Sequence, residues 1–242
     1  YSSAASDVYK RQSLAIKDDL VDISFRQYGI IRTYTLQEFL CTLRGFAYQP
    51  LPRGDRIGVI TYSGANGVMA SDEIYYSGLK LAEFKEETLR RIKNIMPEWQ
   101  PIRNPADLWV ALGVGRNENV YGESMSAVLE DENVDALLCL LLGLPNSDTS
   151  EIREVFANAM ADHPEKPIFI IIFGGKVKER WINELEGLNL PIYPDTSLAV
   201  KTIKAMHMYY SVRDHETLSS LMDPKKFRRA ADRRNDHGPH VV

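Results

Sequence analysis

The stretch RIGVITYSGANGVMASD, residues 56–72, decides the fold, because it joins a strand pattern to a helix pattern through a glycine turn. Ile57, Val59 and Ile60 form the short apolar run of a buried strand. Turn-forming residues fill the segment from Ser63 to Gly67, and Val68 resumes as helix. Such a turn points the first free N–H groups of the helix beyond the strand end, where the helix dipole favours an anion.

Two interpretations of this turn stay open. In the first, the backbone of the turn binds an anion through Ser63, Gly64, Ala65, Asn66 and Gly67. In the second, Gly64 and Gly67 only allow the helix to pack closely on the strand. Neither stronger phosphate motif is present, because no Walker Lys-Ser/Thr follows the turn and a third glycine of the dinucleotide fingerprint is lacking.

Composition bounds the class of protein. The 242 residues, 44% of them hydrophobic, suffice for one large or two small domains. A net charge of -4 gives no reason to expect nucleic acid or an anionic membrane as the main partner. Cys41 and Cys139 lie in apolar segments and are typical of buried thiols. The longest apolar run, 136–142, is far below the ~20 residues of a membrane helix, and no secretory signal is evident, so we expect a cytoplasmic protein.

The segment before the linker 49–54 is expected to be separate from the rest of the chain. Residues 2–12 resemble the in-frame translation of a transposase sequencing adapter, so we interpret 1–12 as an adapter-derived scar. A helix is predicted over 16–28, stopped by Gly29. A second is predicted from Thr35, its N-cap, to Phe46, with its packing face formed by Leu36, Phe39, Leu40 and Leu43.

Beyond the linker, strand and helix patterns alternate. After the opening strand and the helix that resumes at Val68, strands are predicted at 79–84, 134–142, 168–173 and 190–193. Helices are predicted at 88–95, 119–129, 149–161, 177–185 and 197–210. Continuous Val/Ile/Leu runs are typical of strands covered on both faces. The sequence therefore predicts an α/β fold, a doubly wound, flavodoxin-like parallel sheet of about five strands.

In such a sheet, ligands bind beyond the carboxyl ends of the strands. Those ends are expected at 62–67, near Asn104, at 143–146 and at Gly174 and Gly175. Because the glycine-bearing loops converge on one edge, the topology favours the anion site over the packing interpretation.

Catalytic and metal motifs are not evident. Ser63 lies at a sharp turn but lacks the preceding glycine of a nucleophile elbow. His163 is expected to be exposed in a loop, and His207 to pack within a helix. The polar tail, 214–242, carries His237 and His240, which we interpret as part of a disordered terminus and not as metal ligands.

An ordered set of short strings resembles the NDP-forming acyl-CoA synthetases, above all the ADP-forming acetate–CoA ligases, which are related to succinyl-CoA synthetase. The strings are SLA at 13–15, FRQ at 25–27, GIIR at 29–32, PRG at 52–54, the turn 63–72, NPAD at 104–107 and ENVDA at 132–136. The resemblance implies that 13–49 is the helical end of a preceding flavodoxin-like domain. It also implies that 55–213 is the second flavodoxin-like domain of such a ligase.

The same resemblance implies which parts belong elsewhere in the parent enzyme. Counting back from Ser13, the phosphorylated histidine of the family would fall at Lys10, inside the presumed scar, and no ATP-grasp module follows Arg213. We therefore expect this chain alone to bind no cofactor and to be inactive. CoA, ADP or ATP and Mg would belong to the parent, with a CoA-binding, His-bearing domain and an ATP-grasp domain or subunit as partners.

For this domain, the resemblance implies that helix N-termini help to hold phosphate or phosphohistidine during transfer. The expected donors are Ser63 to Gly67, with Gly174 and Gly175 as weaker candidates, while Asn104 and Asp107 are expected to shape the loop. The parent reaction would convert acyl-CoA, ADP and phosphate into acid, CoA and ATP. Two alternatives remain, a non-catalytic scaffold or regulatory subunit and a protein acetyltransferase built on the same domains.

Overall fold

The computed structural model describes residues 18–114, 117–143 and 149–214, which fall into two compact units. The presumed scar at 1–12, Asn146, and the tail beyond 214 lie outside the described residues. The smaller unit contains 18–32 and 211–214, and the larger unit contains 33–210. The assignment of 13–49 to a preceding domain stays a prediction.

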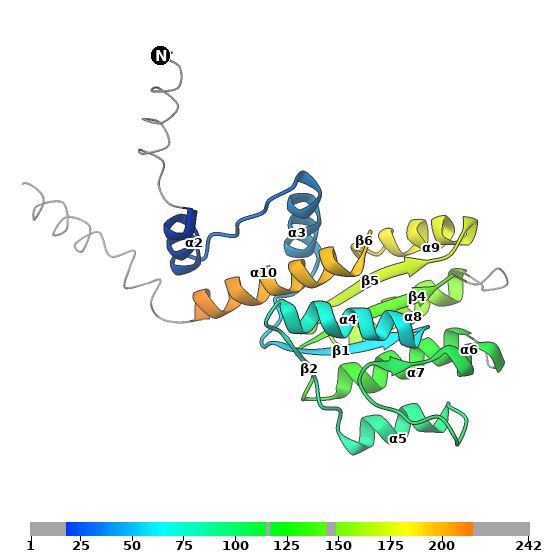
Figure 1. The fold of residues 1–242 in the computed structure, drawn as a ribbon. Helices are drawn as coiled ribbons and strands as arrows, with labels where there is room; N and C mark the ends of the chain where they lie inside the picture. Colours follow the sequence, from blue (N-terminus) through cyan, green and yellow to red (C-terminus); the bar gives the residue numbers. More distant parts are fainter. Residues whose placement is uncertain (1–17, 115–116, 144–148, 215–242) are drawn as a thin grey trace, which may run out of the picture. The chain divides into compact units, whose positions relative to one another are not determined.

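The elements, drawn in Figure 1, alternate along the chain as the sequence predicts. The helices are α2 (Asp18–Gln27), α3 (Leu36–Tyr48), α4 (Gly64–Tyr76), α5 (Glu86–Asn94), α6 (Trp109–Val114), α7 (Asn117–Glu130), α8 (Thr149–Asp162), α9 (Lys176–Glu186) and α10 (Thr196–Asp214). The strands are β1 (Arg56–Thr61), β2 (Lys80–Leu81), β3 (Ala106–Asp107), β4 (Ala136–Leu142), β5 (Ile168–Phe173) and β6 (Ile192–Tyr193).

Helix α2 of the smaller unit ends at a glycine, as predicted. Gly29 has a φ of 66°, and the N–H of Ile30 donates to the carbonyl of Phe25 at 2.8 Å. This pattern closes a helix because a residue without a Cβ tolerates the left-handed conformation. An ion pair between Arg32 and Asp22, 2.7 Å apart, ties the following segment back to the helix.

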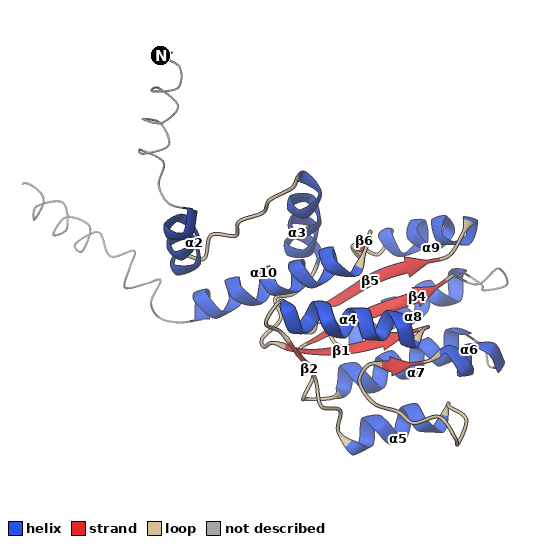
Figure 2. Cartoon of the chain, viewed as in Figure 1, coloured by secondary structure: helices blue, strands red, loops and turns tan. Residues whose placement is uncertain are grey.

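The larger unit is built on a parallel sheet with the strand order β2-β1-β4-β5-β6 (Figures 1 and 2). Strand β3 also pairs with β1, alongside its carboxyl end, whereas β2 pairs alongside its start. Together β2 and β3 occupy the place of one interrupted strand. The order is then that of a flavodoxin-like sheet, which confirms the predicted fold class.

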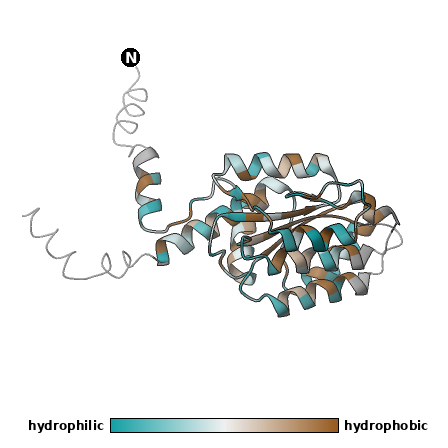
Figure 3. Ribbon diagram, turned by 90° about the horizontal axis from the view of Figure 1, so that it is seen from below, coloured by the Kyte–Doolittle hydropathy of each residue, from teal (hydrophilic) through white to brown (hydrophobic). Residues whose placement is uncertain are grey.

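Helices cover both faces of this sheet, so every long strand is apolar throughout. In β4, Ala136, Leu138 and Leu140 pack with α3, α4 and α10, whereas Leu137, Cys139 and Leu141 face the core formed with α5 to α9. Figure 3 shows largely brown strands between helices that mix teal and brown residues. Cys41 and Cys139 are buried free thiols, as predicted, and burial raises the pKa of both.

The predicted packing face of α3 is wrong. Its N-cap is Thr35, which accepts from the N–H of Glu38 at 3.1 Å, as expected. The apolar side chains predicted to pack are instead 48–74% exposed, namely Leu36, Phe39, Leu40 and Leu43. The helix docks through its opposite side, because Gly45 has no Cβ and lets the backbone approach Thr202 and Met206 of α10.

The strand predicted at 79–84 is wrong in length, and β3 and α6 were not predicted. After β2 the chain leaves the sheet at Ala82 and returns only at Ala106. The side-chain amide of Asn104 fills the gap: its Nδ2 donates to the carbonyls of Ile57 and Ala82 at 2.8 and 2.9 Å, and its Oδ1 accepts from the N–H of Val59 at 2.9 Å. It therefore satisfies the ladder groups that the interruption would leave bare.

An ion pair fixes the opposite end of the sheet. The guanidinium of Arg56 at the start of β1 donates to both carboxylate oxygens of Asp135, just before β4, at 2.9 Å. The N–H of Arg56 also donates to Asp135 at 3.0 Å. These bonds raise the pKa of Arg56. A Cβ at Gly54 would lie 2.2 Å from the same carboxylate, so a residue without a side chain is required there.

Replacement of Asn104 by Ala should lower the free energy of unfolding by about 3 kcal/mol, because it leaves buried backbone groups of β1 unsatisfied. Chemical denaturation measures the loss. The matched control is Asn183→Ala on the exposed surface of α9, which should stay within about 0.5 kcal/mol of the parent. Equal losses in the two variants would contradict the bridging role.

Candidate functional site

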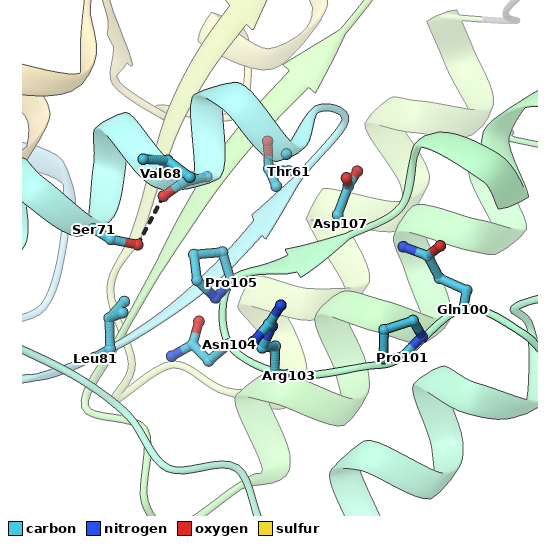
Figure 4. Close-up of a pocket in the computed structure, with 12 residues that line it drawn as sticks. Thr61, Val68, Ser71, Leu81, Gln100, Pro101, Arg103, Asn104, Pro105 and Asp107 are labelled. Carbon is cyan, nitrogen blue, oxygen red and sulfur yellow. Dashed lines mark hydrogen bonds between the residues drawn. The ribbon is translucent and has the colours of Figure 1, made fainter.

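A pocket of about 500 Å³ opens at the carboxyl edge of the sheet. It lies between the end of β1, the first turns of α4 and the segment that leads into β3 (Figure 4). Its lining comes from Thr61, Gly64, Gly67, Val68, Ser71, Leu81, Gln100, Pro101, Arg103, Asn104, Pro105 and Asp107. The lining includes Gly64 and Gly67 of the predicted turn and both residues predicted to shape the loop, Asn104 and Asp107, but not Ser63, Ala65 or Asn66.

The N-terminus of α4 presents unused donors. Ser63 is its N-cap and has extended backbone angles, but its side chain makes no capping bond. The hydroxyl of Thr61 donates to the Ser63 carbonyl at 2.9 Å and accepts from the Ser63 N–H at 3.1 Å. The first N–H to find an acceptor within the helix is that of Gly67, which donates to Ser63 at 3.0 Å. The N–H groups of residues 64–66 therefore have no acceptor within the helix.

The two glycines of the turn, Gly64 and Gly67, have different structural roles. Neither has a positive φ. A Cβ at Gly67 would lie 3.2 Å from Pro105 and 3.3 Å from Thr61, so this glycine allows close packing. A Cβ at Gly64 would meet only the carboxylate of Asp107, at 3.0 Å. Gly64 therefore keeps the space open in front of the helix terminus.

The pocket is also lined by an arginine, Arg103, which was not predicted from the sequence. Arg103 is exposed to solvent and forms no ion pair among the described residues. Its position is set by the split strand, because it precedes Asn104, which is bonded to β1. The signal that could have found it is this adjacency to the NPAD string at 104–107.

Lysine 93 shapes the loop that carries the pocket residues. Its ammonium donates to the carbonyls of Pro97 and Gln100 at 3.0 and 2.7 Å, and also to the carbonyl of Glu98. An ammonium has three donors and no acceptor, so these bonds satisfy it fully. Lys93 thereby links the end of α5 to the start of the segment that continues to Arg103.

Asp107 combines one engaged and one available oxygen. Its Oδ1 accepts from the N–H of Trp109 at 3.1 Å, at the start of α6. Within the described residues its Oδ2 accepts no hydrogen bond. Figure 4 shows the carboxylate pointing toward the turn between β1 and α4. The pocket therefore holds donors from α4, one guanidinium and one carboxylate.

Gly174 and Gly175 lie at the same edge of the sheet but do not line this pocket. Gly174 has a φ of 128°, and a Cβ there would lie 3.1 Å from the carbonyl oxygen of Gly143, so this position requires glycine. Gly175 is the N-cap of α9 and faces open space. Their segment follows β5, two strands away from β1.

Neither histidine of the described residues lies near Ser63. Half-buried His163, which was expected to be exposed, lines a separate hollow with Arg53 and Asp135 at the starting ends of the strands. His207 packs near Asp55, which directly precedes β1, and burial lowers the pKa of His207.

Within the described ranges, no cluster of three or more His, Cys, Asp or Glu side chains is suited to a metal ion. Nor is any described helix long and apolar enough to cross a membrane.

Comparison with known proteins gives a consistent set of relatives. The chain is 32% identical to acetate–CoA ligase [ADP-forming] II of Archaeoglobus fulgidus over 203 residues, which is 81% of this chain and 29% of that protein. It is 31% identical to the alpha subunit of acetate–CoA ligase [ADP-forming] II of Pyrococcus furiosus, over 75% of this chain and 39% of that subunit. The chain is homologous to the ADP-forming acetate–CoA ligases.

Solved structures agree with this homology. A Pyrococcus horikoshii OT3 protein superposes with a TM-score of 0.73 at 27% identity, covering 83% of this chain and 46% of that one. An acetyl-coenzyme A synthetase of Ca. Korarchaeum cryptofilum, solved in complex with phosphate and ADP, shares the fold with a TM-score of 0.72 at 21% identity, over 86% of this chain and 44% of its own. No protein-family model matches the chain.

This ligase homologue spans less than half the length of the curated relatives, between 14% and 42% of the four that match at 30% identity or more. The residues of the pocket, 61–107, fall inside the larger unit.

Replacement of Lys93 by Met should free the loop 97–103, because three carbonyls lose their common donor. Amide hydrogen exchange in 97–103 should become faster, with a stability loss of about 1 kcal/mol. Lys201→Met on the exposed side of α10 is the control and should leave the loop protected as before. Unchanged exchange in the Lys93 variant would show that the loop is held by other contacts.

Proposed function

We propose that this chain is the second flavodoxin-like domain of an ADP-forming acyl-CoA synthetase, with the helical segment before it, and that its α4 pocket positions the phosphoryl group during transfer. The observation that carries the proposal is the pocket at 61–107, which is lined both by Gly64 at the uncapped start of α4 and by Arg103, which has no ion pair among the described residues. Homology to acetate–CoA ligases supports the reaction class.

The donor set suits a phosphoryl group. Its concentrated negative charge is stabilised by fixed donors, and the N–H groups of 64–66 are held in place by the helix itself. Arg103 adds a full positive charge with planar, fork-like donors that match phosphate oxygens. The backbone N–H groups need no rearrangement when negative charge shifts between the phosphate oxygens.

In the proposed parent enzyme the phosphoryl group passes through an acyl phosphate and a phosphohistidine. The histidine, CoA, the adenine nucleotide and Mg belong to other domains or subunits, because the segment matched here covers under half of each relative. The described residues supply phosphate donors but no nucleophile with a base. The chain then acts as one wall of a composite site.

Phosphate titrated into labelled protein should shift the amide resonances of Gly64, Ala65 and Asn66 first, with a dissociation constant in the millimolar range, about -4 kcal/mol. Arg103→Gln should weaken binding about tenfold or more, since it removes a charge-assisted contact. The matched control is Arg90→Gln, which removes an arginine on α5 that is paired with Glu87 outside the pocket. The control should bind phosphate as the parent does.

Shifts confined to Gly174 and Gly175, or an Arg103 variant that binds as tightly as the Arg90 control, would contradict this placement. In either case the α4 turn would be a packing device, because Gly67 already explains its close contact with Pro105.

The purified chain should form no ATP from acetyl-CoA, ADP and phosphate, because the pocket lacks both the phosphate-carrying histidine and a nucleotide site. A coupled luminescence assay measures ATP directly. The positive control is a full-length ADP-forming acetate–CoA ligase. ATP formation by the chain alone, abolished by Arg103→Gln, would refute the composite-site proposal.

A further inference from the structure

The carboxylate of Asp107 is an unexpected member of an anion pocket. Its Oδ2 lies 3.0 Å from where a Cβ of Gly64 would stand, directly beside the α4 terminus. A negative group at this position repels any incoming anion, so it lowers the affinity for the anion unless the anion donates a hydrogen bond to it. An ionised carboxylate can only accept hydrogen bonds. Only an anion that carries a proton can therefore form a hydrogen bond with Asp107.

We propose that Asp107 makes this pocket selective for tetrahedral oxyanions that carry a proton, such as hydrogen phosphate, over fully deprotonated ones such as sulfate. The inference rests on the proposed function, because it concerns the same pocket. It adds the chemical class of ligand and assigns Asp107 the part of a specificity-determining residue.

The geometry separates the two oxygens of Asp107. Oδ1 is committed to the N–H of Trp109, which holds the carboxylate in one orientation at the start of α6. Oδ2 accepts nothing among the described residues and faces the space that Gly64 keeps open. A bound hydrogen phosphate can accept from the α4 N–H groups and Arg103 with its bare oxygens. Its P–O–H then donates to Oδ2.

The other polar groups of the pocket do not replace this acceptor. The hydroxyls of Thr61 and Ser71 already donate to the carbonyls of Ser63 and Gly67, at 2.9 and 2.8 Å. The side-chain Oδ1 of Asn104 is engaged by Val59. Sulfate has the same shape as phosphate but no proton near neutral pH. It would meet Oδ2 oxygen to oxygen, without a hydrogen bond.

The test compares dissociation constants for inorganic phosphate and sulfate at neutral pH and fixed ionic strength, followed through the amide resonances of residues 64–66. The unchanged chain should bind sulfate about tenfold or more weakly than phosphate, because a hydrogen bond to a charged group is replaced by repulsion. Asp107→Asn should reduce this preference to about twofold, chiefly by tightening sulfate. An asparagine can donate to sulfate through its NH₂ and still accept from Trp109 through its Oδ1.

Two controls distinguish a hydrogen bond to Asp107 from a general effect of negative charge on α4 and from an effect of ligand shape. Asp72→Asn removes one negative charge from the exposed side of α4 outside the pocket, so it should keep the full preference for phosphate. Monofluorophosphate has the shape of phosphate but no proton near neutral pH. It should bind to the unchanged chain as weakly as sulfate, a measurement that needs no variant.

Equal binding of phosphate and sulfate to the unchanged chain, or a tenfold preference that survives Asp107→Asn, would overturn this inference and leave the proposed function standing. Tight binding of monofluorophosphate would overturn it as well. If none of these oxyanions shifts residues 64–66, both the proposed function and the inference are wrong.

Discussion

The side-chain amide of Asn104 is the contact on which the candidate site depends. It takes the place of a peptide group between β2 and β3, with three bonds of 2.8–2.9 Å to β1 and to Ala82. Because Asn104 is anchored in the sheet, Pro105 lies against Gly67 of α4, and Arg103 is placed in the lining of the pocket. An interrupted strand thereby becomes a wall of the pocket, and its loop is long enough to deliver polar side chains to the carboxyl edge.

The two ends of the sheet differ in how their polar groups are paired. At the starting end, the Arg56–Asp135 pair joins β1 to β4 with mutually satisfied charges. At the carboxyl end, the first N–H groups of α4 lack an acceptor within the helix, and Arg103 has no ion pair among the described residues. Groups that folding leaves unused are available to a ligand. This contrast supports the proposal that the ligand binds at the α4 edge.

Local patterns predicted much of the fold and part of the site. The apolar runs of β4 and β5, the Gly29 stop and the Thr35 cap depend on neighbours in sequence. The split strand does not, because Asn104 bonds residues 45 and 47 positions away. Arg103 was missed for the same reason. The exposed side of α3 was mispredicted because helical spacing shows which side is apolar, but not whether another part of the protein covers it.

The most direct test of the central claim is a crystal structure of the chain, grown without oxyanions and then soaked in phosphate. The account predicts one tetrahedral anion in the pocket, within hydrogen-bonding distance of the N–H groups of residues 64–66 and of the Arg103 guanidinium. Phosphate bound instead at Gly174 and Gly175, with the α4 pocket empty, would contradict it.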